Sequence, residues 1–197
     1  MGQPAEKLTT RATLADLEAV PPHRVAELVR GVLHIFNRPA PRHARTSSRL
    51  GGELMGPFDT GKGGPGGWVI LDEPELQFPE PGAPGGVEVV SPDLAGWRVE
   101  RMPSLPEEAF FTVAPDWVCE VLSPSTATFD RFEKMPLYAR QRVLHAWLID
   151  PLAHTLEVFR VAGEGGLWML LALHHGDVKV RAEPFEAIEL DLGLLWG

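Results

Sequence analysis

Short runs of alternating or continuous apolar residues dominate the chain, and they predict more strands than helices. In residues 25–36, VAELVRGVLHIF, two such runs flank Arg30-Gly31, which predicts a β-hairpin near the N-terminus. Further runs, separated by turn-forming residues, predict strands over 68–78, 87–90, 118–122, 145–150, 155–161, 167–173 and 178–183. The last three of these strands are expected to form a C-terminal β-meander.

Two longer segments have the apolar spacing of helices. Residues 41–56 can form a helix, and residues 129–143 place Phe132, Met135 and Tyr138 at threefold spacing. The second helix lies between two predicted strands and suits a right-handed crossover that joins parallel neighbours. The order helix, three strands, helix, strand predicts an α/β (α+β) fold, in which helices pack on the faces of a mixed β-sheet. At 197 residues, the chain suits a single domain, 1–197.

A single carboxylate interrupts one of the most apolar of the predicted strands. Residues 116–126 read DWVCEVLSPST, and successive side chains point to opposite faces of a strand. Both faces are then apolar except at Glu120, which predicts a strand covered on both sides. Because an unpaired buried charge is costly, Glu120 is expected to be paired, bound to a metal or protonated.

The charge of the chain is acidic overall but uneven. A net charge of −9 argues against a generic nucleic-acid coat protein. Residues 24–49 contain Glu27 as their only acid, yet they hold six arginines: Arg24, Arg30, Arg38, Arg42, Arg45 and Arg49. This segment is either a solvated charged face or a basic face for phosphates. The start of the sequence has no apolar signal-peptide core, and a single cysteine fits a reducing compartment, so a cytoplasmic protein without a membrane span is expected.

Several common types of site lack support in the sequence. Residues 56–63, GPFDTGKG, nearly match a phosphate-binding P-loop, but Gly63 replaces the Ser/Thr and the segment cannot open a helix. No HExxH or GxSxG motif occurs, and one cysteine cannot build a structural zinc site. Cys119, inside a strand, is expected to be a small core residue rather than a nucleophile.

Hard oxygen ligands for a magnesium ion could come from Glu120 and one aspartate. Asp116 lies four residues before Glu120 on the same strand, roughly 13 Å away, so the two cannot share an ion. Asp93 is expected to end the preceding strand of the core, and side-by-side strands lie about 5 Å apart. A cation that stabilises a transferred phosphate could come from Lys134 on the following helix, which otherwise forms an exposed pair with Asp130.

Several motifs, in this order and at this spacing, resemble the Uma-two family of nucleases: ELVRGVL, SPDLAGW, DWVCEVLSPST, DRFEK followed by Tyr138, and WLIDP. The resemblance covers most of residues 24–160, and the family is similar to the PD-(D/E)xK restriction-endonuclease-like superfamily. It implies a restriction-endonuclease-like core, with the same order of helices and strands as above. It also implies metal-dependent cleavage of phosphodiester bonds in nucleic acid, with DNA as the favoured substrate.

The resemblance further implies roles for particular residues. Asp93 and Glu120 would be ligands of Mg²⁺, or of Mn²⁺, and the backbone carbonyl of Val121 would complete the metal shell. The superfamily has its lysine two residues after the Glu120 position, where this chain has Leu122. In Uma-type sequences the following helix supplies the lysine, which would be Lys134.

Glu27 and His43 match recurrent family positions and are expected to line the cleft, unless they are exposed residues of a strand edge and a helix surface. Restriction-like nucleases often act as dimers, so by analogy a homodimer is expected. Two alternatives stay open. One is a noncatalytic module that kept the nuclease fold and binds nucleic acid or a protein, and the other is a phosphate-ester or nucleotide hydrolase that uses the same metal site.

Overall fold

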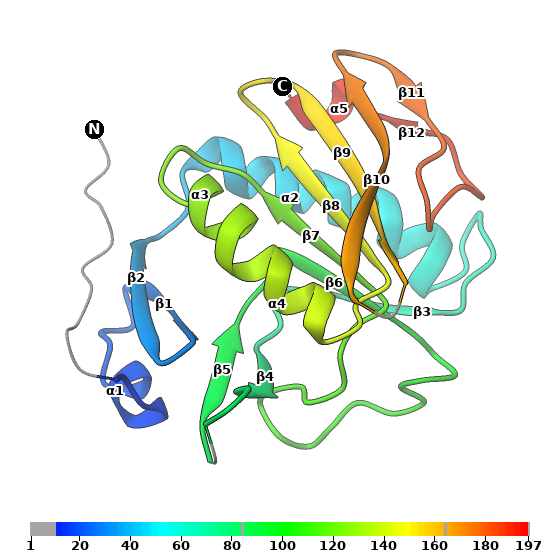
Figure 1. The fold of residues 1–197 in the computed structure, drawn as a ribbon. Coiled ribbons are helices and arrows are strands. Elements are labelled where there is room, and N and C mark those ends of the chain that lie inside the picture. The colour runs from blue at the N-terminus through cyan, green and yellow to red at the C-terminus, as the bar shows by residue number, and fades with distance from the viewer. Residues whose placement is uncertain (1–10, 84, 164, 197) are drawn as a thin grey trace.

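Two β-sheets dominate the protein in a computed structural model, which describes residues 11–83, 85–163 and 165–196 (Figure 1). Within these residues the larger sheet has the strand order β10-β9-β8-β7-β6-β3, and the smaller sheet has the order β2-β1-β5-β4. The strands of the larger sheet are β3 (Trp68–Asp72), β6 (Leu94–Arg98), β7 (Trp117–Val121), β8 (His145–Asp150), β9 (Thr155–Ala162) and β10 (Leu167–His175). Those of the smaller sheet are β1 (Arg24–Val29), β2 (Val32–Asn37), β4 (Leu76–Pro79) and β5 (Val87–Val90), and a separate pair is β11 (Lys179–Val180) with β12 (Leu190–Asp191).

Helices cover both faces of the larger sheet (Figure 1). One face packs against α2 (Pro41–Leu54), which continues as a π-helical turn, η1 (Met55–Asp59). The other face packs against a continuous helical segment made of α3 (Ala127–Phe129), the π-helical η2 (Asp130–Lys134) and α4 (Met135–Arg140). Short helices α1 (Leu14–Glu18) and α5 (Gly193–Trp196) lie near the two ends of the described chain. None of the described helices is long and apolar enough to cross a membrane.

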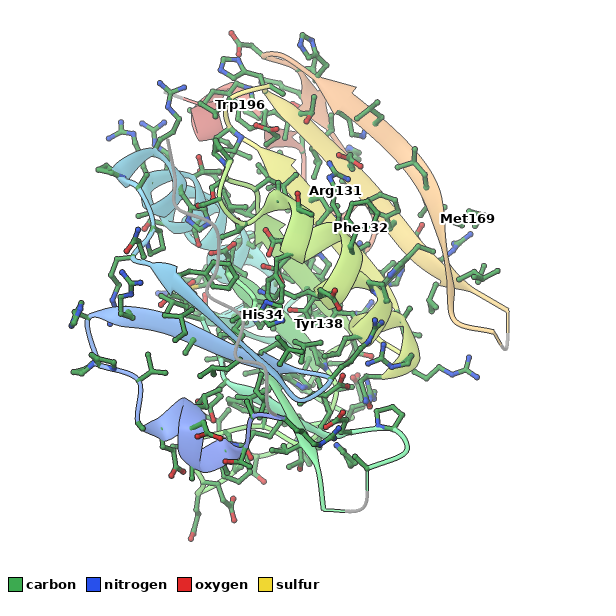
Figure 2. The ribbon with its side chains drawn as sticks, turned by 60° about the vertical axis from the view of Figure 1, so that its left-hand side comes forward. His34, Arg131, Phe132, Tyr138, Met169 and Trp196 are labelled. Carbon is green, nitrogen blue, oxygen red and sulfur yellow. The ribbon has the colours of Figure 1, made fainter. Side chains whose placement is uncertain are left out.

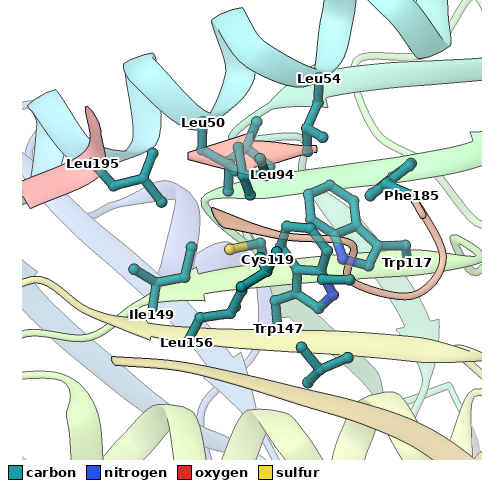
Figure 3. Close-up of a cluster of buried hydrophobic side chains, with 14 of the residues drawn as sticks. Leu50, Leu54, Leu94, Trp117, Cys119, Trp147, Ile149, Leu156, Phe185 and Leu195 are labelled. Carbon is teal, nitrogen blue, oxygen red and sulfur yellow. The ribbon is translucent and has the colours of Figure 1, made fainter. Parts of the chain in front are cut away.

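The core between α2 and the larger sheet is built from leucines and large aromatic rings (Figure 3). Leu50 and Leu54 of α2 are fully buried in this cluster, together with Trp117 of β7. Gly96 of β6 lies between two indoles. A Cβ at that position would be only 3.2 Å from a ring atom of Trp68 and 3.3 Å from one of Trp117. A residue with a Cβ there would require the two rings to shift by a few tenths of an ångström.

The predicted hairpin and crossover are confirmed. Strands β1 and β2 pair with Val29 opposite Val32, and Arg30 and Gly31 between them have φ of 52° and 68°, as a two-residue hairpin turn requires. Strands β7 and β8 are parallel and are connected through α3, η2 and α4, whereas β9 and β10 extend the sheet as an antiparallel meander. The fold is therefore the predicted α+β arrangement of a mixed sheet flanked by helices, with an N-terminal hairpin and a C-terminal meander. The third strand predicted for that meander, 178–183, is wrong: only Lys179–Val180 forms a strand, and it pairs with β12 outside the larger sheet.

Two other strand predictions were also wrong. Residues 68–78 do not form one strand but two, β3 and β4, which belong to different sheets. Glu73 has φ of 45° and Pro74 has no backbone N–H, so the chain leaves the larger sheet at this point. Strand β5 also lies in the smaller sheet, and the core strand beside β7 is β6, which the sequence analysis did not predict. Asp93 consequently precedes a core strand instead of ending one.

Candidate active site

The chain crosses from the smaller to the larger sheet at residues 91–93, and this crossing brings Asp93 beside Glu120. Strands β6 and β7 are antiparallel with Leu94 opposite Cys119, so the residue before Leu94 comes next to the residue after Cys119. The backbone N–H of Val121 donates to Asp93 Oδ2 over 2.7 Å, which fixes the carboxylate at the end of β7. Asp93 thus lies beside Glu120, as the spacing of neighbouring strands predicts, although it precedes β6 and does not end the strand before it.

Glu120 is 2% exposed and has protein partners for its carboxylate. Lys134 Nζ lies 2.8 Å from Oε1 and 2.9 Å from Oε2, and the hydroxyl of Tyr138 donates to Oε1 over 2.6 Å. Burial raises the pKa of Glu120 well above its ordinary value, and the charge of Lys134 opposes this rise. The pKa of Tyr138 is also raised well above its ordinary value, first by burial and then by the charge of Glu120, so its hydroxyl keeps its proton as a donor.

Lys134 reaches the site from η2, and its side chain is surrounded by oxygen atoms. Besides Glu120, its ammonium lies 3.1 Å from Glu27 Oε1 and 4.0 Å from Asp130 Oδ1, and it donates to the carbonyl of Ser91 over 3.0 Å. Burial lowers the pKa of Lys134, but the charges of Glu120, Glu27 and Asp130 outweigh it, and the net pKa is raised. Lys134 is therefore a buried, permanently charged ammonium, and its pair with Asp130 is buried instead of exposed.

Glu27 and Asp130 complete the ring of carboxyl groups around Lys134. Glu27, on β1, accepts the backbone N–H of Ser91 at Oε1 over 3.0 Å, whereas its Oε2 is buried without a hydrogen-bond partner among the described residues. Burial raises the pKa of Glu27, and Lys134 partly offsets this. Burial likewise raises the pKa of Asp130 from 3.8 to about 7. The smaller sheet thus contributes a carboxylate directly to the site.

His43 lies on α2 with its imidazole next to Asp93. Its Nε2 is 3.3 Å from Asp93 Oδ1, and the side chain is buried. Burial lowers the pKa of His43, but the hydrogen bond and the charge of Asp93 raise it more, with smaller contributions from Asp130 and the carbonyl of Val121. The net pKa is raised, so a positive imidazolium is favoured beside the Asp93 carboxylate.

These groups open onto a cleft of about 650 Å³ between the hairpin, the N-terminus of α2 and the start of the crossover helix. All five side chains predicted to form the site line it: Glu27, His43, Asp93, Glu120 and Lys134. Arg24 and Arg38 of the basic segment line it as well. The alternative prediction, that Glu27 lies at an exposed strand edge and His43 on an exposed helix surface, is wrong, since both side chains are buried.

The structure places other candidate residues outside this constellation. Asp116 accepts the backbone N–H of Arg98 at Oδ2 and forms an ion pair with Arg101 at Oδ1, both over 2.8 Å. Its carboxylate is thus held at the opposite end of β7 from the cleft. Cys119 points into the core on the α2 side, where burial raises its pKa well above the ordinary value. Neither residue belongs to the site.

Two members of the site were not assigned a role by the sequence analysis. The apolar spacing predicts Tyr138 only as part of a helical apolar face, and the four-residue spacing predicts Asp130 only as a surface partner of Lys134. A signal was available, because Asp130, Lys134 and Tyr138 are spaced four residues apart and therefore follow one side of a helix. A polar stripe of this kind on a helix that covers a buried carboxylate indicates that the stripe faces inward.

The oxygen atoms at this end of β7 have the chemistry that suits magnesium. Mg²⁺ is bound through one or two carboxylates and keeps further positions for water and phosphate oxygens. Asp93 and Glu120 supply carboxylates, the carbonyl of Val121 lies near the same imidazole as Asp93, and Glu27 Oε2 has no protein partner. Within the described ranges no three His, Cys, Asp or Glu side chains gather into a group that could hold a metal by themselves. A magnesium ion at this place would therefore need further ligands from water or substrate.

The larger sheet and its two covering helices define the class of fold. The order α2, β3, β6, β7, crossover helix and β8 is the helix–three strands–helix–strand core of restriction-endonuclease-like proteins. The chain belongs to the Uma2 family, described as "putative restriction endonuclease", whose family model matches residues 12–193.

A solved structure shares this fold. It is a "putative nuclease belonging to DUF820" from Anabaena variabilis, and it superimposes with a TM-score of 0.69 over 93% of this chain and 97% of that chain, at 20% sequence identity. The search of curated proteins gave no significant match.

Proposed function

We propose that this chain is a magnesium-dependent nuclease that hydrolyses phosphodiester bonds of nucleic acid at the site formed by Asp93, Glu120 and Lys134. The observation that carries the proposal is the position of Lys134. Its ammonium lies 2.8 Å from Glu120, although the strand position two residues after Glu120 is occupied by Leu122. A helix thus supplies the cation that the strand lacks, next to the carboxylate of Glu120 on β7 and that of Asp93 just before β6.

Each residue has a role that follows from its surroundings. Asp93 and Glu120, with the carbonyl of Val121, would hold Mg²⁺, which when bound polarises the scissile phosphate and activates a water molecule. Lys134 keeps its proton because of the raised pKa, so it stabilises negative charge on the phosphate and does not act as a base. Tyr138 fixes the orientation of the Glu120 carboxylate through its 2.6 Å hydrogen bond, and His43 does the same for Asp93.

Cleavage of plasmid and of single-stranded oligonucleotides in Mg²⁺ or Mn²⁺ tests the proposal. Asp93→Ala and Glu120→Ala should each abolish cleavage and weaken Mn²⁺ binding measured by calorimetry, while circular dichroism shows that the variants are folded. Glu189→Gln, which changes an exposed carboxylate paired with Lys179, is the control that should cleave normally. Cleavage that persists in both alanine variants would refute the assignment of the site.

One observation favours a second function, a noncatalytic module that binds nucleic acid. Both oxygens of Glu120 already contact Lys134, and Oε1 also accepts from Tyr138, so the protein itself neutralises this carboxylate. If this pairing is never released, the protein would bind nucleic acid without cutting it in either metal. It would also show no Mn²⁺ binding by calorimetry, a result that would favour the noncatalytic module over the nuclease.

A further inference from the structure

An aromatic surface lies in the same cleft as the acidic cluster. Phe36 of β2 is half-buried and lines the cleft together with Phe129 of α3. The two ring centroids are 5.1 Å apart, and the imidazole of His34 packs 4.4 Å from Phe129. His34 and Phe129 are both about nine-tenths buried, so they support Phe36 from the interior. Phe36 is therefore an ordered ring that keeps part of its surface on the cleft.

Two arginines that are held by hydrogen bonds lie at the open end of the β1–β2 hairpin, close to the Phe36 ring. Arg24 is opposite Asn37 in the β1–β2 pairing, and its guanidinium donates to Asn37 Oδ1 over 2.6 Å. Arg38 donates to the carbonyl of Pro22 over 2.8 Å. Both arginines are exposed and line the cleft, so their charges are available to a ligand. Arg24 is three residues from Glu27 along β1, or about 10 Å.

We infer that the cleft takes nucleic acid as a single strand, with one base stacked on Phe36 and a neighbouring phosphate bound by Arg24 and Arg38. A volume of about 650 Å³ suits a nucleotide-sized group. Bases inside a duplex are stacked on one another, so they reach a protein ring only after they leave the helix. Aromatic rings combined with cations along the backbone are the usual means of binding single strands. This inference rests on the proposed function, because it names the form of the substrate at the same site.

Fluorescence anisotropy in EDTA tests binding without cleavage. The probes are a labelled single-stranded DNA, an RNA of the same sequence and the corresponding DNA duplex. At least one single strand should bind about tenfold or more tightly than the duplex. Phe36→Leu should weaken that binding by about 5-fold to 150-fold, the range for loss of one stacked base, and Phe36→Trp should preserve it. Phe132→Leu is the matched control, because Phe132 is 69% exposed on η2 and does not line the cleft (Figure 2).

The salt dependence of binding tests the two arginines. Arg24→Gln and Arg38→Gln should each lower the slope of log Kd against log salt concentration by about 0.7, the value for one phosphate contact on a single strand. Arg181→Gln is the control, since Arg181 is also exposed and also donates to a backbone carbonyl, that of Glu186, but lies outside the cleft.

The outcomes separate this inference from the proposed function. Equal affinity for duplex and single strand, or equal effects of Phe36→Leu and Phe132→Leu, would overturn the single-strand inference. Metal-dependent cleavage of a duplex could still be observed in that case, and the proposed function would stand. Conversely, tight single-strand binding that needs Phe36, without cleavage in Mg²⁺ or Mn²⁺, would support the inference and refute the nuclease.

Discussion

Replacement of Asp130 by asparagine is expected to stabilise the protein, although it removes a partner of a buried lysine. Asp130 is 4% exposed, and its nearest cation, Lys134, is 4.0 Å away and closer to Glu120 and Glu27. Burial, together with the charge of Glu27, raises the pKa of Asp130 from 3.8 to about 7 against the opposing effect of Lys134. One ammonium thus faces more carboxyl groups than it can neutralise.

The size of the effect follows from this pKa. Because the folded protein binds the Asp130 proton more tightly than the unfolded chain does, the stability that this group contributes is complete below about pH 4. It is lost as the pH rises toward about 7. At pH 8 the ionised group costs on the order of 4 kcal/mol relative to a neutral one. Asp130→Asn should therefore match the wild type near pH 4 and be more stable by up to that amount at pH 8.

Urea unfolding in EDTA, followed by tryptophan fluorescence from pH 4 to pH 8, measures this difference. With an m-value of about 2 to 3 kcal/mol/M, the midpoint at pH 8 should rise by roughly 1.5 M. The control is Asp116→Asn, which changes another buried aspartate, but one that is paired with Arg101 over 2.8 Å. That variant should lose stability. A gain for Asp130→Asn that does not depend on pH, or a loss at pH 8, would refute the electrostatic reasoning.

Three further predictions concern the interactions around the site. Lys134→Met should abolish cleavage and lower stability by roughly 3–5 kcal/mol at pH 8, because it leaves Glu120 without its cation. The loss should be smaller at pH 5, where Glu120 can take up a proton, and urea titrations at both pH values check this. Tyr138→Phe should cost about 1–3 kcal/mol in unfolding experiments and slow plasmid cleavage, since Glu120 loses a hydrogen bond. Wild-type cleavage by that variant would contradict the orienting role of Tyr138. Glu88→Gln should lower stability by about 1–3 kcal/mol, because the buried Glu88 carboxylate loses its ion pair with the partly exposed Arg140, yet leave cleavage below the unfolding temperature unchanged, as Glu88 does not line the cleft.

The strands and the buried carboxylate could be predicted because both depend on local sequence. The apolar residues around Glu120 require a strand covered on both faces, and every residue of β7 is indeed buried. The turn at Arg30-Gly31 is equally local, since two residues with positive φ define it. The burial of Glu27 could not be predicted in this way. It depends on the smaller sheet packing against the crossover helix, where Glu88 of β5 meets Arg140 of α4.

The errors in the strand prediction have a physical cause that the sequence only partly reveals. Residues 68–78 form one nearly continuous apolar run, yet β3 and β4 belong to different sheets. Pro74 within the run was the available signal, because proline removes a ladder hydrogen bond. Strand β6 was harder to predict. Its Gly96 weakens the strand pattern, and only the two indoles on either side of it explain why glycine is required.

The π-helical turn η2 influences which side chains of the crossover helix face the Glu120 carboxylate. Leu122 is 3% exposed and packs in the core beneath the crossover helix, so a lysine there would have to replace part of that core. In a regular α-helix, residues four apart are rotated by about 40°, and Asp130 and Tyr138 would then diverge by about 80°. A π-helical turn contains more residues than an α-helical turn, so the turn at 130–134 offsets part of the rotation that would otherwise accumulate between Asp130 and Tyr138. Lys134 at the end of η2 and Tyr138 one turn later in α4 both reach Glu120, at 2.8 Å and 2.6 Å. The wide turn therefore keeps Asp130, Lys134 and Tyr138 on one side of the helix, and a one-residue deletion in 130–134 should rotate Tyr138 relative to Asp130 even where the helix itself is retained.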